Sequence, residues 1–352
     1  MIDNVKYKVL GVMSGTSLDG VDLAICSFTK TNKWEFEITK SETIKYPNYW
    51  KENLETLHSK DEKEISKIDI EYGFFLGSTI NTFLDNEKVD FIASHGHTIF
   101  HDPENNYTLQ IGCGKTISKI TKTTTINDFR SLDVSLNGQG APLVPIGDLH
   151  LFSDFKYCIN LGGFANISIK NETRITAFDV CPVNIVMNEI SKKLGLEFDF
   201  GGDIAKKGGI IPELLQELNN LDFYKKLPPK SLGREWVEEF INPLLLEKYK
   251  SRDILHTFCE HIAMQIGIFL KDKSALFTGG GVFNTYLISR IKHYSSSEII
   301  IPNQETIDFK EALIFAFLGV LRVRNEANCL KSVTGAKHDN CGGKINYPNK
   351  ES

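Results

Sequence analysis

The chain has 352 residues, of which 41% are hydrophobic and 24% charged, and its formal net charge is −5. This composition is typical of a soluble globular enzyme, and the length exceeds what one hydrophobic core usually organises, so we expect two lobes. The net negative charge argues against a surface for nucleic acid or anionic lipid. No signal peptide and no run approaching the ~18 apolar residues of a membrane span is visible, so we expect a cytoplasmic protein.

The first part of the chain predicts an antiparallel meander. Three apolar runs with strand character follow one another with short links, which is typical of such a meander. A stretch with helical spacing of its apolar residues and one more strand come next. The predicted elements are strands at 7–13, 21–28, 34–40 and 89–94, a turn at 14–20 and a helix over 54–85.

The same order of elements returns midway along the chain. Strands are predicted at 157–161, 165–169 and 173–178, with Gly162 and Gly163 in the first turn. A repeated strand–turn–strand–strand unit followed by helices predicts two copies of one α/β fold. This is how the actin-like (ribonuclease H-like) ATPases are assembled, with two lobes around a cleft.

The repeat also predicts the domain boundaries. We expect the first lobe to contain residues 1–150 and 310–352, and the second lobe to contain 151–309. The last predicted elements are a helix over 254–271, a strand at 275–278, a helix opened by the glycines at 279–281, a strand at 298–302, a helix over 309–323 and a loosely held tail after 337.

The turn after the first strand is a candidate phosphate-binding site. A tight turn of Gly, Ser and Thr between two strands exposes consecutive backbone N–H groups, which together bind an anion. Asp19 or Asp22 can hold Mg²⁺ through water. The turn is neither a Walker loop nor a Rossmann fingerprint, and an ordinary hairpin turn is the alternative. Its residues are Gly15, Thr16, Ser17, Leu18, Asp19, Gly20, Val21 and Asp22.

Two further glycine turns favour a nucleotide over an ordinary hairpin. Gly162 and Gly163 repeat the first turn in the second meander. Gly279, Gly280 and Gly281 lie between a strand and a predicted helix, where a ligand can approach the backbone and the helix N-terminus favours an anion. A turn without a ligand remains the alternative for this last segment.

Two acids are candidates for chemistry. Asp179 ends a predicted strand, where a carboxylate can act as general base on water or a sugar hydroxyl. A turn or capping Asp before Pro182 is the alternative interpretation. Glu311 stands at the predicted start of the last helix, and its alternative is a first-turn acid favoured by the helix dipole.

Two histidines and one arginine complete the candidate residues. His95 and His97 are two apart on a predicted extended segment and would point to the same face, as a metal pair does. No further ligand cluster accompanies them, so we favour neutral histidines lining a polar pocket. Arg130 can contact a carboxylate or a phosphate, and a structural arginine is the alternative.

Taken together, these strings resemble the anhydro-N-acetylmuramic acid kinase family. The motifs keep the family order and cover nearly the whole chain. They are G-V-M-S-G-T-S-L-D-G-V-D at 11–22, S-H-G-H-T-I-F-H-D-P at 94–103, L-Q-I-G at 109–112, D-F-R at 128–130, G-Q-G-A-P-L-V-P at 138–145, N-L-G-G-F-A-N-I at 160–167, P-P-K-S-L-G-R-E at 228–235, G-G-G-V-F-N at 279–284, E-A-L-I-F-A-F-L at 311–318 and S-V-T-G-A at 332–336.

The resemblance implies a two-lobed actin-like fold and a homodimer. It implies that ATP and Mg²⁺ are used to open the 1,6-anhydro ring of anhydro-N-acetylmuramic acid and to phosphorylate O6, giving N-acetylmuramic acid 6-phosphate in cell-wall recycling. Residues 15–22 would then hold the ATP phosphates, Asp179 would be the general base and Glu311 would support it near the sugar. The substrate-binding candidates on cleft-lining motifs are His95, His97 and Arg130.

The chain departs from the family pattern near Asp179. The family usually has Gly-Pro-Gly-Asn where this chain has Cys181, Pro182, Val183 and Asn184. Asn188 replaces a family Asp, and His97 replaces a family Gln. These changes bear on substrate range. Two alternatives therefore stay open: a kinase for a related anhydrosugar such as levoglucosan, and a nucleotide-binding protein of the same fold without phosphoryl transfer.

Overall fold

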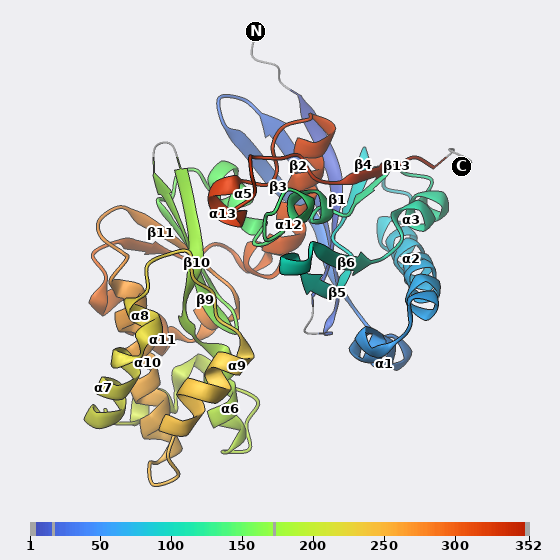
Figure 1. The fold of residues 1–352 in the computed structure, drawn as a ribbon. Helices are drawn as coiled ribbons and strands as arrows, with labels where there is room; N and C mark the ends of the chain where they lie inside the picture. The colour runs from blue at the N-terminus through green and yellow to red at the C-terminus, as the bar shows by residue number, and fades with distance from the viewer. Residues whose placement is uncertain (1–4, 16–17, 172–173, 349–352) are drawn as a thin grey trace. The chain divides into compact units, whose positions relative to one another are not determined.

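The computed structural model describes residues 5–15, 18–171 and 174–348. The chain divides into two compact units. The first unit contains residues up to 151 together with those from 309 onward, and the second contains 152–308. Each unit has a sheet of its own with helices packed against it (Figure 1). Within the described ranges, no helix is long and apolar enough to cross a membrane.

The sheet of the first unit begins with the predicted meander. β1 (Lys6–Ser14), β2 (Gly20–Lys30) and β3 (Trp34–Lys45) pair antiparallel in sequence order. β4 (Phe91–Ser94) then pairs parallel to β1, and β7 (Thr125–Asn127) pairs parallel to β4. β13 (Lys344–Asn346) closes the edge, so the strand order is β13-β7-β4-β1-β2-β3.

Helices cover both faces of this sheet. The first face packs against α1 (Asn48–Thr56), α2 (Glu62–Leu84) and α3 (Gly114–Thr121), through one cluster of buried apolar side chains. The other face packs against α12 (Gln304–Val323), where a Cβ at Gly11 would collide with the carbonyl of Ala312. A glycine in β1 therefore lets the last long helix lie directly on the strand.

The second unit repeats the same sheet. β8 (Tyr157–Leu161), β9 (Phe164–Asn171) and β10 (Arg174–Pro182) form an antiparallel meander, and β11 (Ser274–Thr278) and β12 (Glu298–Ile300) extend it in parallel. The order β10-β9-β8-β11-β12 matches β3-β2-β1-β4-β7 of the first unit in sequence and direction. This repeat confirms the predicted α/β class with two ribonuclease H-like lobes of the actin-like type.

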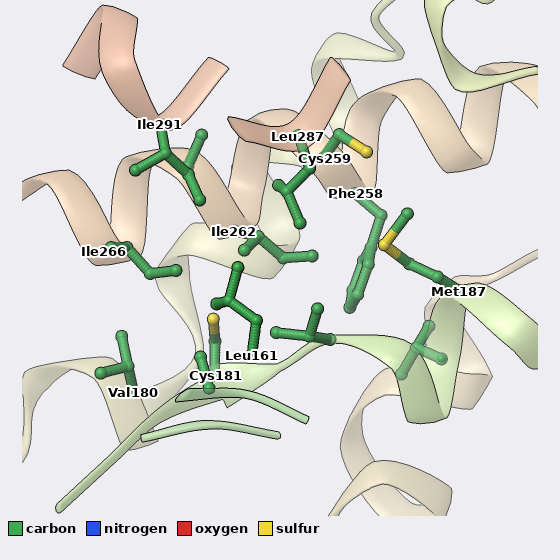
Figure 2. Packing of buried hydrophobic residues seen from close by; sticks show 14 of the residues in the cluster. Leu161, Val180, Cys181, Met187, Phe258, Cys259, Ile262, Ile266, Leu287 and Ile291 are labelled. Atoms are coloured by element: carbon green, nitrogen blue, oxygen red, sulfur yellow. The ribbon is translucent and has the colours of Figure 1, made fainter. Parts of the chain in front are cut away.

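Four helices bury one face of the second sheet. They are α6 (Asn184–Lys192), α7 (Pro212–Asn220), α10 (Ser251–Gly267) and α11 (Thr285–Tyr294). Figure 2 shows Leu161 and Val180 of the strands against Ile262 and Ile266 of α10, with Leu287 of α11 nearby. Burying each such side chain stabilises the folded state by about 1.5–3 kcal/mol, so this face of the sheet forms part of the hydrophobic core.

The prediction of one continuous helix over 54–85 is wrong. A 3₁₀ turn (Leu57–Ser59) separates α1 from α2. The carboxylate of Asp61 accepts a hydrogen bond from the N–H of Glu64 at 2.9 Å, and this side-chain cap starts α2 afresh. The apolar spacing continues across the break, so periodicity does not reveal it.

The prediction of a loosely held tail after 337 is also wrong. Lys344–Asn346 pairs antiparallel with β7, and the Asn346 side chain donates hydrogen bonds to Thr125 O at 3.1 Å and Asn127 Oδ1 at 2.9 Å. A strand of three residues is too short to show the alternation of apolar and polar side chains that predicts a strand. This segment is ordered by its pairing with β7 instead.

Candidate active site

The first group of candidate residues lies where three parallel strands of the first unit end. Val12 of β1 is in register with Ser94 of β4, and Ala93 of β4 with Ile126 of β7. The segments that follow these strands therefore meet at one edge, which is where α/β sheets bind ligands. The candidate residues at this edge are Ser14, Asp22, His95, His97, Arg130 and Glu311.

The predicted phosphate turn connects β1 to β2 at this edge. Thr16 and Ser17 lie outside the described residues. Leu18 has a φ of 59°, and its N–H lies 3.4 Å from Gly15 O. A Cβ on Gly20 would lie 2.5 Å from the Ile44 carbonyl, so this glycine also serves the pairing of β2 with β3.

The two predicted metal ligands differ in their surroundings. Asp19 is exposed. Asp22 is half-buried and accepts a hydrogen bond from the hydroxyl of Thr43 at 2.6 Å. Val21, between them, is fully buried in the core. The turn therefore presents one carboxylate to solvent and anchors the other.

Arg130 is held by two groups of its own unit. Its Nε and Nη2 donate to His95 Nε2 at 3.1 and 2.9 Å, and its Nη1 donates to Gly140 O at 2.7 Å. Since His95 Nε2 accepts, its proton is on Nδ1 and the ring is neutral. Burial, followed by the charge of Arg130, lowers the pKa of His95 well below its usual range.

His97 faces a different set of partners. Its Nδ1 lies 3.2 Å from Ser14 Oγ, which also contacts the hydroxyls of Tyr46 at 2.5 Å and Tyr72 at 2.8 Å. Gly96, with φ 76°, interrupts the extended segment. The prediction that both histidines share one face is therefore wrong.

The favoured alternative, neutral histidines, agrees with this geometry. His95 Nε2 is occupied by Arg130, and burial lowers the pKa of His97 to about 4. In the part of the chain that the structure describes, no group of three or more His, Cys, Asp or Glu side chains is arranged to hold a metal ion.

We expect His97→Gln to make the protein less sensitive to acid. The pKa of His97 is about 4 in the folded chain and near 6.5 when exposed, so stability is lost as the pH falls through that interval. From pH 7 to pH 5 the loss amounts to about 2 kcal/mol. Gln cannot titrate, and its amide can still bond Ser14. Urea unfolding at both pH values measures the difference.

The matched control is His58→Gln, because His58 is exposed. It should keep the wild-type pH dependence of stability. An unchanged dependence in His97→Gln would contradict the assignment of this effect to His97.

Glu311 lies just after a break in α12. The helix begins at Gln304, where Asn303 Oδ1 accepts from Thr306 N at 3.0 Å, and Phe309 interrupts it with non-helical backbone (φ −110°, ψ 15°). Glu311 therefore stands in the first turn of the segment that follows the kink, in agreement with the first-turn interpretation. The side chain keeps an exposed surface, yet the surrounding protein displaces enough water to raise its pKa, while Arg130 opposes and Asp22 adds to the shift.

Asp133 is a residue that the sequence analysis missed. It is fully buried, and its Oδ2 accepts from Gly140 N at 2.8 Å. Its Oδ1 accepts from Thr334 Oγ1 at 2.9 Å and Asn340 Nδ2 at 2.7 Å. It thus ties the C-terminal segment to the loop whose carbonyl holds Arg130. No spacing signal marks it, because its partners are distant in sequence.

The two later glycine turns lie beside each other in the second unit. Thr278 of β11 is in register with Asn160 of β8, so Gly162–Gly163 and Gly279–Gly281 follow adjacent parallel strands. A Cβ on Gly279, which has φ 83°, would lie 2.6 Å from Asn160 Oδ1, and one on Gly281 would lie 2.7 Å from Leu161 Cβ. A Cβ on Gly280 would meet nothing within 4 Å.

The prediction that these glycines open a helix is wrong. Gly280 and Gly281 belong to a 3₁₀ turn (Gly280–Phe283), and the α-helix α11 begins only at Thr285. The side chain of Asn284 caps that helix by accepting from Leu287 N at 2.9 Å. The binding capacity of Gly279–Gly281 therefore rests on their backbone and not on a helix N-terminus.

Asp179 lies near the end of β10, at the same end of the second sheet. Its N–H donates to Lys230 O at 3.1 Å, and its Oδ2 accepts from Leu232 N at 2.9 Å. Burial raises the pKa of Asp179, and the Leu232 N–H partly offsets this. Its other oxygen has no hydrogen-bond partner among the described residues. A part-buried carboxylate with a raised pKa and a free oxygen is suited to accept a proton.

The segment around Lys230 and Leu232 carries a function that the sequence analysis did not assign. It lies in the motif P-P-K-S-L-G-R-E at 228–235. Its main chain runs beside the outer edge of β10 and fixes one carboxylate oxygen of Asp179. These contacts are made by the backbone, so no pattern of side chains in the sequence indicates that this motif holds Asp179.

The anhydro-N-acetylmuramic acid kinase family model matches residues 7–348 of this chain. The chain belongs to this family. It is accordingly an ATP-dependent carbohydrate kinase, as its sequence predicted.

Curated relatives agree along the full length. The anhydro-N-acetylmuramic acid kinase of Francisella tularensis subsp. novicida (strain U112) is 35% identical over 377 residues, covering 97% of this chain and 99% of the relative. That of Bacillus cereus (strain AH187) is 32% identical over 378 residues, with the same coverage.

Solved structures resemble the chain only distantly. One is an activator of the 2-hydroxyisocaproyl-CoA dehydratase from Clostridium difficile, with a TM-score of 0.40 and 13% identity over 90% of this chain and 97% of that chain. Another is a ROK family glucokinase from Streptomyces griseus, with a TM-score of 0.39 and 10% identity over 88% and 98%. Similarity at this level carries no functional implication.

Two of the departures from the anhydro-N-acetylmuramic acid kinase pattern lie in the core. Cys181 and Val183, at positions where the family usually has glycine, are both fully buried. Figure 2 shows Cys181 among Leu161 and Val180 in the helix-covered core. Their larger side chains therefore fill the interior beside Asp179 instead of projecting from the sheet edge.

Proposed function

We propose that this chain uses ATP to phosphorylate 1,6-anhydro-N-acetylmuramic acid, opening the anhydro ring and giving N-acetylmuramic acid 6-phosphate for peptidoglycan recycling in the cytoplasm. The observation that carries the proposal is the geometry of Asp179. One of its oxygens is fixed by Leu232 and the other is free, with a raised pKa, at the sheet edge that also bears the glycine turns. Family membership supports the choice of sugar.

In the proposed reaction, Asp179 acts as the general base. Its free oxygen takes a proton from water while the water oxygen bonds to the anomeric carbon of the sugar. The bond from that carbon to O6 breaks, O6 attacks the γ-phosphorus, and ADP leaves. The proton then passes from Asp179 to solvent. Anhydrosugar, water and ATP thus become sugar 6-phosphate, ADP and one proton, and the raised pKa makes Asp179 a better base near neutral pH.

The phosphates would bind to backbone amides. Residues 15–22 in the first unit, with Gly162–Gly163 and Gly279–Gly281 in the second, present turns between strands or after them, and such turns bind anions. Positioning and charge neutralisation account for most of phosphoryl-transfer catalysis.

Asp19 and Asp22 fit the requirements of Mg²⁺. This ion is usually held by one or two carboxylates and keeps several waters, so it does not need a cage of three acids. Asp19 is exposed and free to take such a role, and Asp22 is held by Thr43 near the start of β2, three residues further along the chain. When bound, the ion would neutralise charge on the phosphates.

Arg130 and Glu311 would bind the sugar, with His95 and His97 shaping the pocket around them. The guanidinium has five N–H donors, and His95 and Gly140 occupy three, which leaves two. The lactyl carboxylate of the muramic acid is a natural partner for such a donor pair. We also propose a homodimer, as the family resemblance implies.

A direct assay tests the proposed function. Purified protein with ATP, Mg²⁺ and 1,6-anhydro-N-acetylmuramic acid should form N-acetylmuramic acid 6-phosphate, detected by mass spectrometry. Absence of a sugar phosphate would rule out the proposal. A higher kcat/KM for levoglucosan would select the related-sugar alternative. Tight ATP binding without turnover on any anhydrosugar would select the non-catalytic one.

We expect Gly280→Ala to raise the KM for ATP by roughly 10-fold, because a methyl group then occupies the space where a phosphate would approach the backbone. A Cβ there meets no protein atom within 4 Å, so stability should not change. Gly209→Ala is the matched control, since a Cβ there also meets nothing within 4 Å. An unchanged KM for ATP in Gly280→Ala would exclude this turn from the nucleotide site.

A further inference from the structure

A row of four polar residues crosses the second sheet at the edge where Asp179 lies. Thr278, Asn160, Asn166 and Asp179 are successive register partners on β11, β8, β9 and β10. We call them the polar row. Directly paired residues place their side chains on the same face of a sheet.

This face is the one opposite the helices. The neighbours Ile159, Ile167 and Phe178 belong to the buried cluster that the helices cover. Because successive side chains alternate, Asn160, Asn166 and Asp179 project from the other face. Asn160 and Asp179 are half-buried and Asn166 is exposed, in agreement with this alternation.

Asn166 and Asp179 form the closer kind of cross-strand pair. The N–H of Asp179 donates to Lys230 O, which lies on the side away from β9. The pair is therefore not hydrogen-bonded through its backbone, and in such pairs the Cα atoms lie about 4.5 Å apart with the side chains closest. The register shift in β10 comes only after Asp179.

Both side chains of this pair have unused hydrogen-bonding capacity. No hydrogen bond or ion pair joins the Asn166 carboxamide to any other residue in the described ranges. Asp179 uses one oxygen for Leu232 and keeps the other free. A carboxamide both donates and accepts, whereas a carboxylate only accepts. Asn is also depleted in strands, so its presence in β9 does not serve the sheet.

We propose that Asn166 positions the water that Asp179 activates. This inference rests on the proposed function. The carboxamide oxygen of Asn166 accepts one O–H of the water while the free oxygen of Asp179 accepts the other and takes its proton. The O–H held by Asn166 remains as the new anomeric hydroxyl, and the water lone pair points at the anomeric carbon. Water held between these two groups loses orientational freedom that would otherwise slow the attack.

Steady-state kinetics of the full chain with ATP and the anhydrosugar test this role. We expect Asn166→Ala to lower kcat by about 10- to 100-fold and to leave the KM for ATP within about twofold. Asn166→Thr, which favours a strand but lacks the carboxamide, should show the same loss. The matched control is Asn171→Ala on the same strand, which should behave as wild type.

The outcomes separate the two proposals. If the wild type forms sugar phosphate and Asn166→Ala keeps kcat within about twofold, Asn166 has no such role and the proposed function stands. An equal loss in Asn171→Ala would also overturn the inference, because a general effect on β9 would then explain it. If the wild type forms no sugar phosphate, both proposals fail.

Discussion

Asp179→Asn is expected to lower kcat by at least about 100-fold, the effect of removing a general base. The amide has nearly the same shape and can still accept the Leu232 N–H that now bonds Oδ2 at 2.9 Å. It cannot take a proton from water. Steady-state turnover of the anhydrosugar measures the loss, and near-normal turnover would remove Asp179 from the role.

The same substitution should not destabilise the protein. Burial raises the pKa of Asp179 in the folded chain, so the folded state holds its proton more tightly than the unfolded state. Such a group costs stability once the pH rises above its folded pKa, because the buried carboxylate is then charged. At neutral pH, Asp179→Asn removes this cost, and we expect an equal or higher melting temperature. Asp203→Asn, at an exposed site in the same unit, should keep wild-type turnover.

Asp133→Ala is expected to cost about 3 kcal/mol or more, because each buried donor left unsatisfied costs about 1–3 kcal/mol. The carboxylate is fully buried and accepts three hydrogen bonds, from Gly140, Thr334 and Asn340. Urea unfolding followed by tryptophan fluorescence measures the loss, since Trp34 and Trp50 are buried in the same unit.

A helix cap provides the comparison for Asp133. Asp61 accepts one hydrogen bond, from Glu64, at the exposed start of α2. Asp61→Ala should therefore cost only about 1 kcal/mol. A loss in Asp133→Ala no larger than this would contradict the view that Asp133 ties the C-terminal segment to the loop beside Arg130. Weaker sugar binding in Asp133→Ala would be consistent with that view.

The strands of both meanders were predictable because their signal is local. An apolar run and a glycine-containing turn lie within a few residues of each other, and the two copies support one another. The same local character made the glycine turns and Asp179 visible as candidates. Element ends were less predictable. The side chains of Asp61, Asn284 and Asn303 start three helices at places that apolar spacing does not mark.

The sequence was sufficient for the fold class, the family and most candidate residues, since short motifs in a conserved order carry that information. It could not show which of those residues meet. Arg130 finds His95 35 positions away, Asp179 finds Leu232 53 positions away, and Asp133 finds Thr334 201 positions away.

The pairing of Asn166 with Asp179 is another contact that the sequence could not show. Strand register depends on the whole sheet, and a shift of one residue would move either side chain to the opposite face. Single residues in the sequence thus indicated the chemistry. The contacts that hold and orient their side chains form only when distant segments of the chain pack together.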